Sequence, residues 1–320
     1  NINSPNQKKL FTKDYPYNAS LSVKFYKYLN QLASEINDAN KIKKKNKFII
    51  EIGSCDGAFL EFFAKRKISH LGIEPTLNNH RIAQKKGIVS INKFFSYKLS
   101  KEILSKYSNA DVIFSSNVIA HINNINDTFR GIKNILSNKG VLIFENIYLN
   151  DLIFNLSFDQ LYDEHVYTLS VTTVNNIAKR HGLNLYDLKH TSIQGGSMRY
   201  YITADLARKK NLVVSKYLEK ESKSNFFNKQ HLHLFFNKCK KIREELLAIT
   251  KKIKKDNKII VGYGASAKAT FLVNFCNMNS SHINFIFDSS PQKLNKFLPG
   301  TDIKIVDELK AKNYNFDFVI

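Results

Sequence analysis

The chain has 320 residues, of which 43% are hydrophobic and 24% charged, so it can bury ordinary cores in about two domains and is not a disordered chain. No apolar run is long enough to span a membrane, and no secretory signal opens the sequence. The net charge of +22 favours anionic partners, although the lysines are spread along the whole chain, as a general compositional bias would spread them.

The chain has three cysteines, Cys55, Cys239 and Cys276, which lie far apart in the sequence. None belongs to a CxxC pair, so the sequence predicts neither a zinc site nor a disulfide framework, and we expect no metal. Reduced cysteines fit a cytoplasmic protein. The first residue is Asn1 and the chain stops in an apolar run over 316–320, so we expect that flanking sequence has been trimmed.

The first half of the chain has the pattern of an α/β domain. After a polar and aromatic stretch over residues 1–22, apolar residues at helical spacing predict a helix over 23–40. Helical stretches then alternate with strand-like apolar runs over 48–52, 69–73, 111–115 and 140–145. This alternation predicts a parallel sheet with helices on both faces.

The second half predicts a long helix and a further α/β unit. Residues 151–200 are less regular and dense in Tyr, His and Glu. Apolar positions that step by three or four predict one helix over 226–256. After it we expect a strand over 258–263, a helix over 267–275 and a strand over 282–287 that ends at Asp288. The fold class is therefore α/β, with a Rossmann-like first domain and a second Rossmann-like domain at the C-terminus.

A glycine-containing loop follows the first predicted strand. Its pattern is E-x-G-x-x-x-G, formed by Glu51, Gly53 and Gly57. Glycines let the backbone turn tightly and approach a ligand, and a helix starting after the loop would add free N–H groups. Glu74 ends the next strand about 20 residues on, where a carboxylate can hold ribose hydroxyls. The loop is neither a dinucleotide fingerprint nor a P-loop.

The loop resembles motif I of class I S-adenosylmethionine-dependent methyltransferases, and further segments extend the resemblance to the sugar C-methyltransferases over residues 10–305. The strand and loop over 111–122 resemble the family's fourth strand. Tyr-Asp-Glu-His at 162–165 resembles its Tyr-His-Glu-His, and Gln-Gly-Gly-Ser-Met-Arg at 194–199 resembles its His-Gly-Gly-Ser-x-Arg. Segments 261–268 and 298–301 resemble its Gly-Tyr-Gly-Ala-x-Ala-Lys and a final turn.

The resemblance has two departures. The family begins with a cysteine-rich zinc domain that this sequence does not contain, and Asp163 and Gln194 stand where the family has His. The family organisation implies an N-terminal segment over the active site at 1–40, a methyltransferase domain with a catalytic insert at 41–200, a connecting region at 201–256, and a nucleotide-sugar domain at 257–320.

Family members use S-adenosylmethionine to methylate a carbon of a nucleotide-linked keto-deoxysugar, usually next to the ketone. The resemblance implies that the cofactor is bound by Glu51, Gly53, Ser54, Asp56, Gly57, Glu74, Pro75 and Asn117. It implies that the sugar nucleotide is bound by Tyr15, Tyr17, Gly196, Ser197, Arg199, Gly264, Ala265 and Lys268. For the two tyrosines a hydrophobic clasp of the N-terminus, and for Arg199 a buried structural role, are open alternatives.

Methylation next to a ketone requires a base for the α-proton and a stabilising group for the enolate oxygen. His165 is the candidate base because the ordinary pKa of imidazole, near 6.5, suits proton transfer at neutral pH. Glu164 or Tyr162 would orient the substrate or the base. His121, just beyond a predicted strand, is the candidate donor to the enolate oxygen. The opposite assignment, with His121 as the base, stays open.

Other functions compete with this hypothesis. The same base could serve O- or N-methylation of a sugar, and the charge would suit an RNA-binding methyltransferase, although no nucleic-acid motif is present. The second glycine turn could belong to an NAD dehydrogenase, with Asp288 at the ribose, but its third glycine is replaced by Ala267. Because Asp163 replaces a histidine of the family motif, a cofactor-binding protein that has lost catalysis is a further alternative. We expect a monomer or homodimer, no membrane or nucleic-acid partner, and solvated basic runs at 41–47 and 251–258.

Overall fold

The computed structural model describes residues 5–13, 15–40, 47–224 and 228–320, and the chain forms two compact units. The first unit comprises the chain up to Asp151 together with Asp163–Ser224. The second comprises Leu152–Tyr162 and the chain after Ser224. The backbone therefore passes between the units three times. The boundaries of these units differ from the domain boundaries expected from the sequence.

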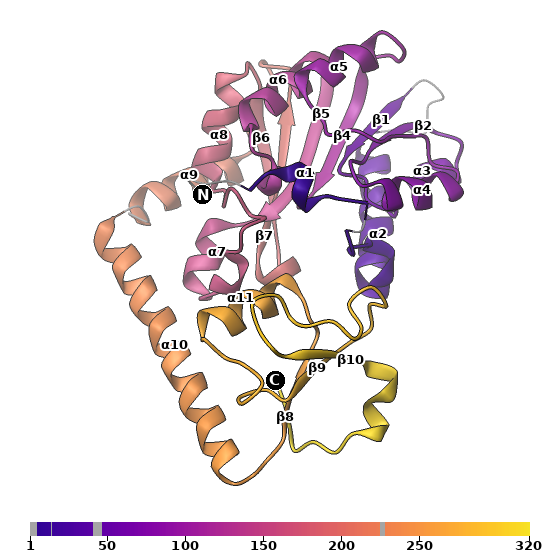
Figure 1. Cartoon of the computed structure of the whole chain (residues 1–320). Coiled ribbons are helices and arrows are strands. Elements are labelled where there is room, and N and C mark those ends of the chain that lie inside the picture. Colours follow the sequence, from indigo (N-terminus) through magenta and orange to yellow (C-terminus); the bar gives the residue numbers. More distant parts are fainter. Residues whose placement is uncertain (1–4, 14, 41–46, 225–227) are drawn as a thin grey trace. The chain divides into compact units, whose positions relative to one another are not determined.

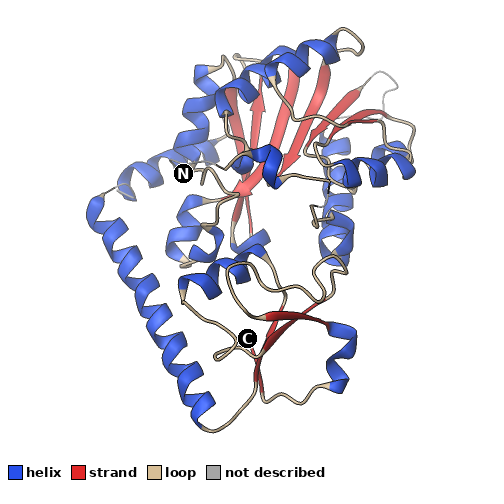
Figure 2. Ribbon diagram, viewed as in Figure 1, coloured by secondary structure: helices blue, strands red, loops and turns tan. Residues whose placement is uncertain are grey.

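Within the described ranges, the first unit is built on a seven-stranded sheet of order β3-β2-β1-β4-β5-β7-β6 (Figures 1 and 2). Strands β1 to β5 run parallel, and β7 is antiparallel to β5 and to β6. The strands are β1 (Phe48–Ile52), β2 (Ser69–Ile73), β3 (Ser90–Ile91), β4 (Ala110–Ser116), β5 (Leu136–Ile147), β6 (Asn184–Thr191) and β7 (Ser197–Thr203). The four predicted strands are present, but the sheet is mixed rather than wholly parallel.

Helices cover both faces of this sheet (Figure 1). Alternate residues of each strand point to opposite faces, so Ile49 packs in a core with α2 and α3 while Ile50 packs in another with α5, α6 and α8. The α-helices are α1 (Gln7–Leu10), α2 (Val23–Ala39), α3 (Glu61–Ala64), α4 (Leu77–Lys85), α5 (Tyr97–Leu104), α6 (Ile125–Ile135), α8 (Val171–Arg180) and α9 (Leu212–Ser224), with α7 (Leu149–Phe154) at the passage to the second unit. Short 3₁₀ helices are η1 (Ala19–Leu21), η2 (Ile119–His121) and η4 (Ile193–Gly195).

Two expectations about the first unit have different outcomes. The helix predicted over 23–40 is α2, which begins where the Ser22 hydroxyl accepts a hydrogen bond from Phe25 N–H at 3.2 Å. The prediction of a helix directly after the glycine loop is wrong, because α3 starts only at Glu61 and has four residues. Residues 58–60 form a buried turn instead, so the loop has no helix N-terminus beside it.

The second unit has a smaller, wholly parallel sheet of order β10-β9-β8-β11. Its strands are β8 (Ile260–Tyr263), β9 (Phe285–Asp288), β10 (Lys304–Asp307) and β11 (Phe318–Val319). Its helices are η3 (Phe158–Gln160), α10 (Lys229–Lys255), α11 (Ala267–Phe275) and η5 (Glu308–Asn313). The predicted long helix, the helix over 267–275 and both strands are present, although β9 begins three residues later than expected.

The predicted basic runs lie partly outside the described residues. Residues 41–46 are not described, and Lys47 pairs with Asp111 at 2.6 Å. The run at 251–258, at the end of α10, is largely exposed. In the described part of the chain, no helix combines the length and the hydropathy needed to cross a membrane.

Candidate functional site

The loop between β1 and α3 has a shape that favours glycine at two positions. Gly53 has φ +71° and Gly57 has φ +79°, in the left-handed region. A Cβ on Gly53 would also lie 2.3 Å from a methyl group of Val118, which follows β4. The N–H groups of Gly53 and Ser54 both donate to the Ile73 carbonyl, at 2.8 and 3.2 Å. The loop is therefore fixed against the ends of β2 and β4.

Glu74 stands at the carboxyl end of β2 and is only 5% exposed. Its Oε1 accepts hydrogen bonds from the Thr76 N–H and hydroxyl, and its Oε2 accepts one from the Cys55 N–H at 2.8 Å. Cys55 itself has φ +48°. The carboxylate thus links β2 to the glycine loop, and Oε2 keeps acceptor capacity for a ligand hydroxyl. Neighbouring Pro75 accepts a hydrogen bond from Asn92 through its carbonyl.

Glu51, Asp56 and Glu74 form an acidic group at this end of the sheet. Glu51 Oε2 and Asp56 Oδ1 are buried and have no hydrogen-bond partner among the described residues. Asp56 Oδ2 accepts from Lys86 Nζ at 3.1 Å and from the Ser20 N–H. Burial, and then the negative charges of Asp56 and Glu74, raise the pKa of Glu51 well above its usual range. Lys86 is the only cation paired with this group in the described ranges.

These observations fit the expected cofactor. S-adenosylmethionine has a cationic sulfonium and ammonium end and a ribose, and the group offers an excess of buried carboxylate oxygens. Ser54 Oγ and Asn117 Oδ1 are likewise buried, and neither has a hydrogen-bond partner in the part of the chain that the structure describes. Asn117, at φ +54°, follows β4. A ligand with positive charge and hydroxyl donors would satisfy acceptors that are otherwise costly to bury.

Two histidines and a glutamate meet beyond β4. The rings of His121 and His165 lie 4.9 Å apart between centroids, at 62°. Glu164 Oε2 lies 4.0 Å from His121 Nδ1 and accepts a hydrogen bond from the Tyr15 hydroxyl at 3.1 Å. The Tyr167 N–H donates to the Ala120 carbonyl at 3.1 Å, which ties the two segments together. The structure thus brings together three of the four predicted catalytic residues.

The environment of this group changes its protonation. Burial, and then the nearby His165, lower the pKa of His121 from 6.5 to about 3, so this imidazole is neutral at neutral pH. Its side chain is 14% exposed, and Nδ1 has no hydrogen-bond partner among the described residues. Burial raises the pKa of Glu164, and the hydrogen bond from Tyr15 opposes that shift.

The N-terminal segment packs against both groups. The Tyr17 carbonyl accepts hydrogen bonds from Asn79 Nδ2 at 3.0 Å and from Cys55 Sγ at 3.7 Å, while Tyr17 as a residue is 49% exposed. The Phe11 ring lies edge-on to His121, with centroids 5.7 Å apart. Sequence reasoning missed Phe11, because no spacing or motif signals a contact between residues so far apart in the chain.

The predicted substrate residues near β7 serve the fold. Gly196, at φ +127°, leaves no room for a Cβ because Asp151 Oδ2 would lie 2.2 Å from it. Ser197 is buried and its hydroxyl donates to the Ile193 carbonyl. A role of Gly196 and Ser197 in substrate binding stays a prediction. Tyr162, the fourth predicted catalytic residue, belongs to the second unit and is partly exposed.

Arg199 is the centre of a buried network. It is 2% exposed, and its Nε donates to Glu145 at 2.7 Å. Its Nη2 donates to the Tyr28 hydroxyl at 2.8 Å, and that hydroxyl donates to Glu145. Because Tyr28 lies on α2, the guanidinium joins α2 to β5 and β7. The structure favours the structural interpretation of Arg199 over a substrate-binding one.

The second unit repeats a strand, glycine turn and helix. Gly264 has φ +92° and open space where a Cβ would be. The Ala265 N–H donates to Asp288 Oδ2 at 2.8 Å, and Lys293 Nζ lies 3.2 Å from the same oxygen. Lys268 lies in the first turn of α11 and is half-buried. Asp288 therefore holds the turn.

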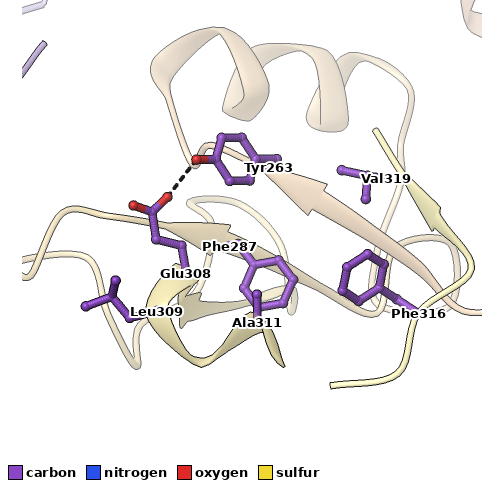
Figure 3. Close-up of a pocket in the computed structure, with 7 residues that line it drawn as sticks. All are labelled: Tyr263, Phe287, Glu308, Leu309, Ala311, Phe316 and Val319. Atoms are coloured by element: carbon purple, nitrogen blue, oxygen red, sulfur yellow. Dashed lines mark hydrogen bonds between the residues drawn. The ribbon is translucent and has the colours of Figure 1, made fainter. Parts of the chain in front are cut away.

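A cavity of about 350 Å³ lies beside this turn. Figure 3 shows aromatic rings around it and a hydrogen bond of 2.7 Å from the Tyr263 hydroxyl to Glu308 Oε2. The cavity is lined by Tyr263, Phe287, Glu308, Leu309, Ala311, Phe316 and Val319. In the described ranges, no group of three or more His, Cys, Asp or Glu residues is arranged to hold a metal ion.

Comparisons with known proteins agree with this architecture. The family model described as a methyltransferase domain matches residues 25–188, and the model described as a C-methyltransferase C-terminal domain matches residues 192–320. The C-methyltransferase NovU of Streptomyces niveus is 25% identical over 273 residues, which cover 85% of this chain and 65% of that protein. The chain thus spans slightly less than two thirds of the length of this curated relative.

Two solved structures illustrate more distant similarity. The magnesium protoporphyrin IX methyltransferase of Synechocystis, with bound SAM, has a TM-score of 0.42 and 10% identity over 56% of this chain and 79% of that one. A possible histamine N-methyltransferase of Thermotoga maritima has a TM-score of 0.41 and 15% identity over 57% and 94%. The two family matches together cover nearly the whole chain and confirm the resemblance found in the sequence. The chain belongs to the C-methyltransferase family.

Proposed function

We propose that this protein transfers the methyl group of S-adenosylmethionine to the carbon next to the ketone of a nucleotide-linked keto-deoxysugar. The observation that supports this most is the meeting of His121, His165 and Glu164 beyond β4, in the same unit as the acidic group of Glu51 and Glu74. Parallel strands place ligands at their carboxyl ends, where both groups lie.

When bound, S-adenosylmethionine supplies an electrophilic methyl group. Glu51 and Asp56 would hold its cationic end, and Glu74 would hold the ribose hydroxyls. The positive-φ turn at Gly53 would let the backbone approach the ligand closely. The residues of the chain then have to bind the sugar, move one proton and stabilise one oxygen.

His165 would accept the α-proton of the sugar. The C–H bond breaks, its electron pair forms the enolate, and the imidazole of His165 becomes a cation that later releases its proton to water. His121 is a poor base, because a pKa of about 3 leaves it neutral and weakly basic. A neutral imidazole can still donate one N–H to the developing enolate oxygen, and in a dry site such a donor is effective.

Glu164 and Tyr15 would orient the histidines. The Tyr15 hydroxyl occupies Glu164 Oε2, the same oxygen that lies 4.0 Å from His121 Nδ1. This hydrogen bond fixes the position of the carboxylate beside His121. Tyr15 therefore acts on the site through Glu164.

The second unit would bind the nucleotide part of the substrate. The open Gly264 turn, Lys268 and the neighbouring aromatic cavity together offer room, a positive charge and ring surfaces. A diphosphate-linked nucleotide has the matching chemistry, with negative charge and a planar base. The sugar and the carbon that is methylated are part of the same proposal.

The test combines calorimetry with isotope exchange. We expect S-adenosylhomocysteine to bind, and a dTDP-linked 4-keto-6-deoxy sugar to exchange its α-proton for deuterium in D₂O when the protein is present. His165→Ala should keep the cofactor affinity and lose the exchange by at least about a hundredfold, the contribution typical of a general base. His181→Ala, which alters a histidine at the end of α8, is the matched control.

Each outcome has a distinct meaning. If the protein transfers the methyl group without exchanging the α-proton, and the methyl group is found on an oxygen or nitrogen of the sugar, the O- or N-methylation alternative would replace carbon methylation. Exchange that survives in His165→Ala but is lost in His121→Gln would reverse the two histidine roles. Failure of S-adenosylhomocysteine to bind at saturating concentration would overturn the proposal.

A further inference from the structure

We infer that Phe11 is a positioning residue of the proposed reaction: its ring covers one edge of the His121 imidazole, excludes water from it and holds it facing His165 and Glu164. The catalytic consequence rests on the proposed function. The effect on His121 itself does not, because it follows from the packing alone.

Phe11 is held against His121 from several sides. The two rings meet edge to face, at 5.7 Å and 85°. Behind it, the Phe11 ring contacts Tyr15 at 5.0 Å and Phe94 at 6.4 Å. The side-chain amide of Gln7, one helical turn earlier, donates to the His121 carbonyl. Aromatic rings in this geometry attract one another and pack without gaps, so the position of Phe11 is well determined.

The polar groups around His121 act in opposite directions. Glu164 Oε2, 4.0 Å from Nδ1, would stabilise the cationic form, and the carbonyls of Asn117 and Glu164 also favour it. His165, with its ring 4.9 Å away, disfavours a second positive charge. Burial outweighs these groups, and Phe11 supplies an apolar part of that burial.

Removal of the ring would therefore change the protonation of His121. Water could reach the imidazole, and its pKa would move back toward the ordinary value near 6.5. A cationic His121 would be drawn toward Glu164 and away from the position in which it donates to an enolate oxygen. Tyr15 would lose its ring contact with Phe11 at the same time, which weakens the hydrogen bond that keeps Glu164 in place.

The chain offers a matched set of variants. Phe11→Ala removes the ring, Phe11→Leu keeps an apolar side chain of smaller volume, and Phe94→Ala removes a ring that contacts Phe11. Phe11 follows the short helix α1 and belongs to neither apolar core of the first unit. We therefore expect all three variants to fold.

The experiment is a histidine titration by nuclear magnetic resonance on the full chain, without substrate. We expect the His121 imidazole of the unaltered protein, assigned with His121→Gln, to stay neutral down to about pH 4, given a pKa of about 3. In Phe11→Ala the pKa of His121 should rise by at least about one unit, in Phe11→Leu by less, and in Phe94→Ala hardly at all.

The pH profile of α-proton exchange gives a second readout. Phe11→Ala should lower the exchange rate at saturating sugar, with KM little changed, and should introduce a new titration near pH 4–6 that Phe94→Ala does not show (about one to three units above the original pKa). An unchanged His121 pKa in natively folded Phe11→Ala would overturn the inference, as would an unchanged pKa in Phe11→Leu if the alanine variant does not fold. A titration shift without any methyl transfer would leave the positioning of His121 intact and refute the proposed function.

Discussion

At the scale of single residues, Glu51 combines a stability cost with a proposed role in cofactor binding. A carboxylate that is 4% exposed, next to two further carboxylates and with one oxygen lacking a partner, destabilises the folded chain when it ionises. Its pKa is raised in the folded state, so the folded chain binds a proton more tightly than the unfolded chain does. Stability is therefore present below the ordinary carboxyl pKa and is lost as the pH rises through the folded pKa.

Glu51→Gln should therefore stabilise the cofactor-free protein at neutral pH while weakening cofactor binding. The expected gain is about 1.4 kcal/mol for each unit by which the folded pKa exceeds the ordinary one, and the expected loss of S-adenosylmethionine affinity is at least about tenfold. Urea unfolding at pH 5 and pH 8 and calorimetry measure the two effects. Glu244→Gln, at an exposed glutamate of α10, is the control and should change neither. Equal cofactor affinity in Glu51→Gln would contradict the role assigned to Glu51.

The sequence predicted some site residues better than others, because a motif does not determine the partners of every side chain in it. His121, His165 and Glu164 could be named from segments whose order matches a family, and the structure brings them together. Arg199 had the same kind of signal, yet its side chain is engaged with Glu145 and Tyr28. A motif identifies a residue type at a position, but the partners of a long side chain depend on packing that the motif does not contain.

At the scale of elements, the loop after β1 depends on two separate constraints at Gly53. The left-handed φ disfavours any side chain, and Val118 occupies the place of a Cβ. Gly87, at φ +78° with nothing within 4 Å of a Cβ, has the first constraint without the second. A comparison of substitutions at the two glycines therefore separates the effect of backbone strain from the effect of steric overlap.

Gly53→Ala should destabilise the protein more than Gly87→Ala does. We expect about 1–2 kcal/mol for Gly87→Ala from the backbone conformation and about 1–3 kcal/mol more for Gly53→Ala from overlap with Val118. Urea unfolding measures both. Adding Val118→Ala to Gly53→Ala should recover part of the excess, and equal losses in the two single variants would show that Val118 moves freely aside.

Element prediction succeeded where the apolar pattern is continuous and failed where it is not. The five residues of β1 are all buried, so its run is unmistakable, and α11 has the predicted bounds. The sequence did not predict the antiparallel pair β6 and β7, because β6 and the start of β7 lie in the irregular stretch between 151 and 200, where the apolar pattern is not continuous. The helix expected beside the glycine loop failed because residues 58–60 are buried in the core as a turn.

At the scale of the whole molecule, the compact units and the family models divide the chain differently. The C-terminal family model begins at residue 192, whereas the first unit continues to Ser224. β7 explains the difference, because it pairs with both β5 and β6 inside the first sheet. A cut at 192 would leave two strand edges unpaired, which proteins avoid. The segment matched by the C-terminal model is therefore not a separate folding unit.

The second unit also depends on residues from the first half of the chain. Phe158, in the inserted segment Leu152–Tyr162, is 5% exposed and contacts Phe275 and Phe271 of α11 at 5.1 and 6.3 Å. The next residues along the chain after this segment include Glu164 and His165. The segment thus belongs to the packing of one unit and leads directly into the proposed catalytic residues of the other.

Phe158→Ala should destabilise the second unit selectively, by about 3–5 kcal/mol, because it removes a buried ring and leaves a cavity against α11. Hydrogen exchange should show faster exchange in α11 and β8, with β1 and β4 unchanged. Phe129→Ala, which removes an equally buried ring from the first unit, should give the reverse pattern. Acceleration throughout the chain in both variants would mean that the two units unfold together, since local opening reports the stability of each cooperative unit separately.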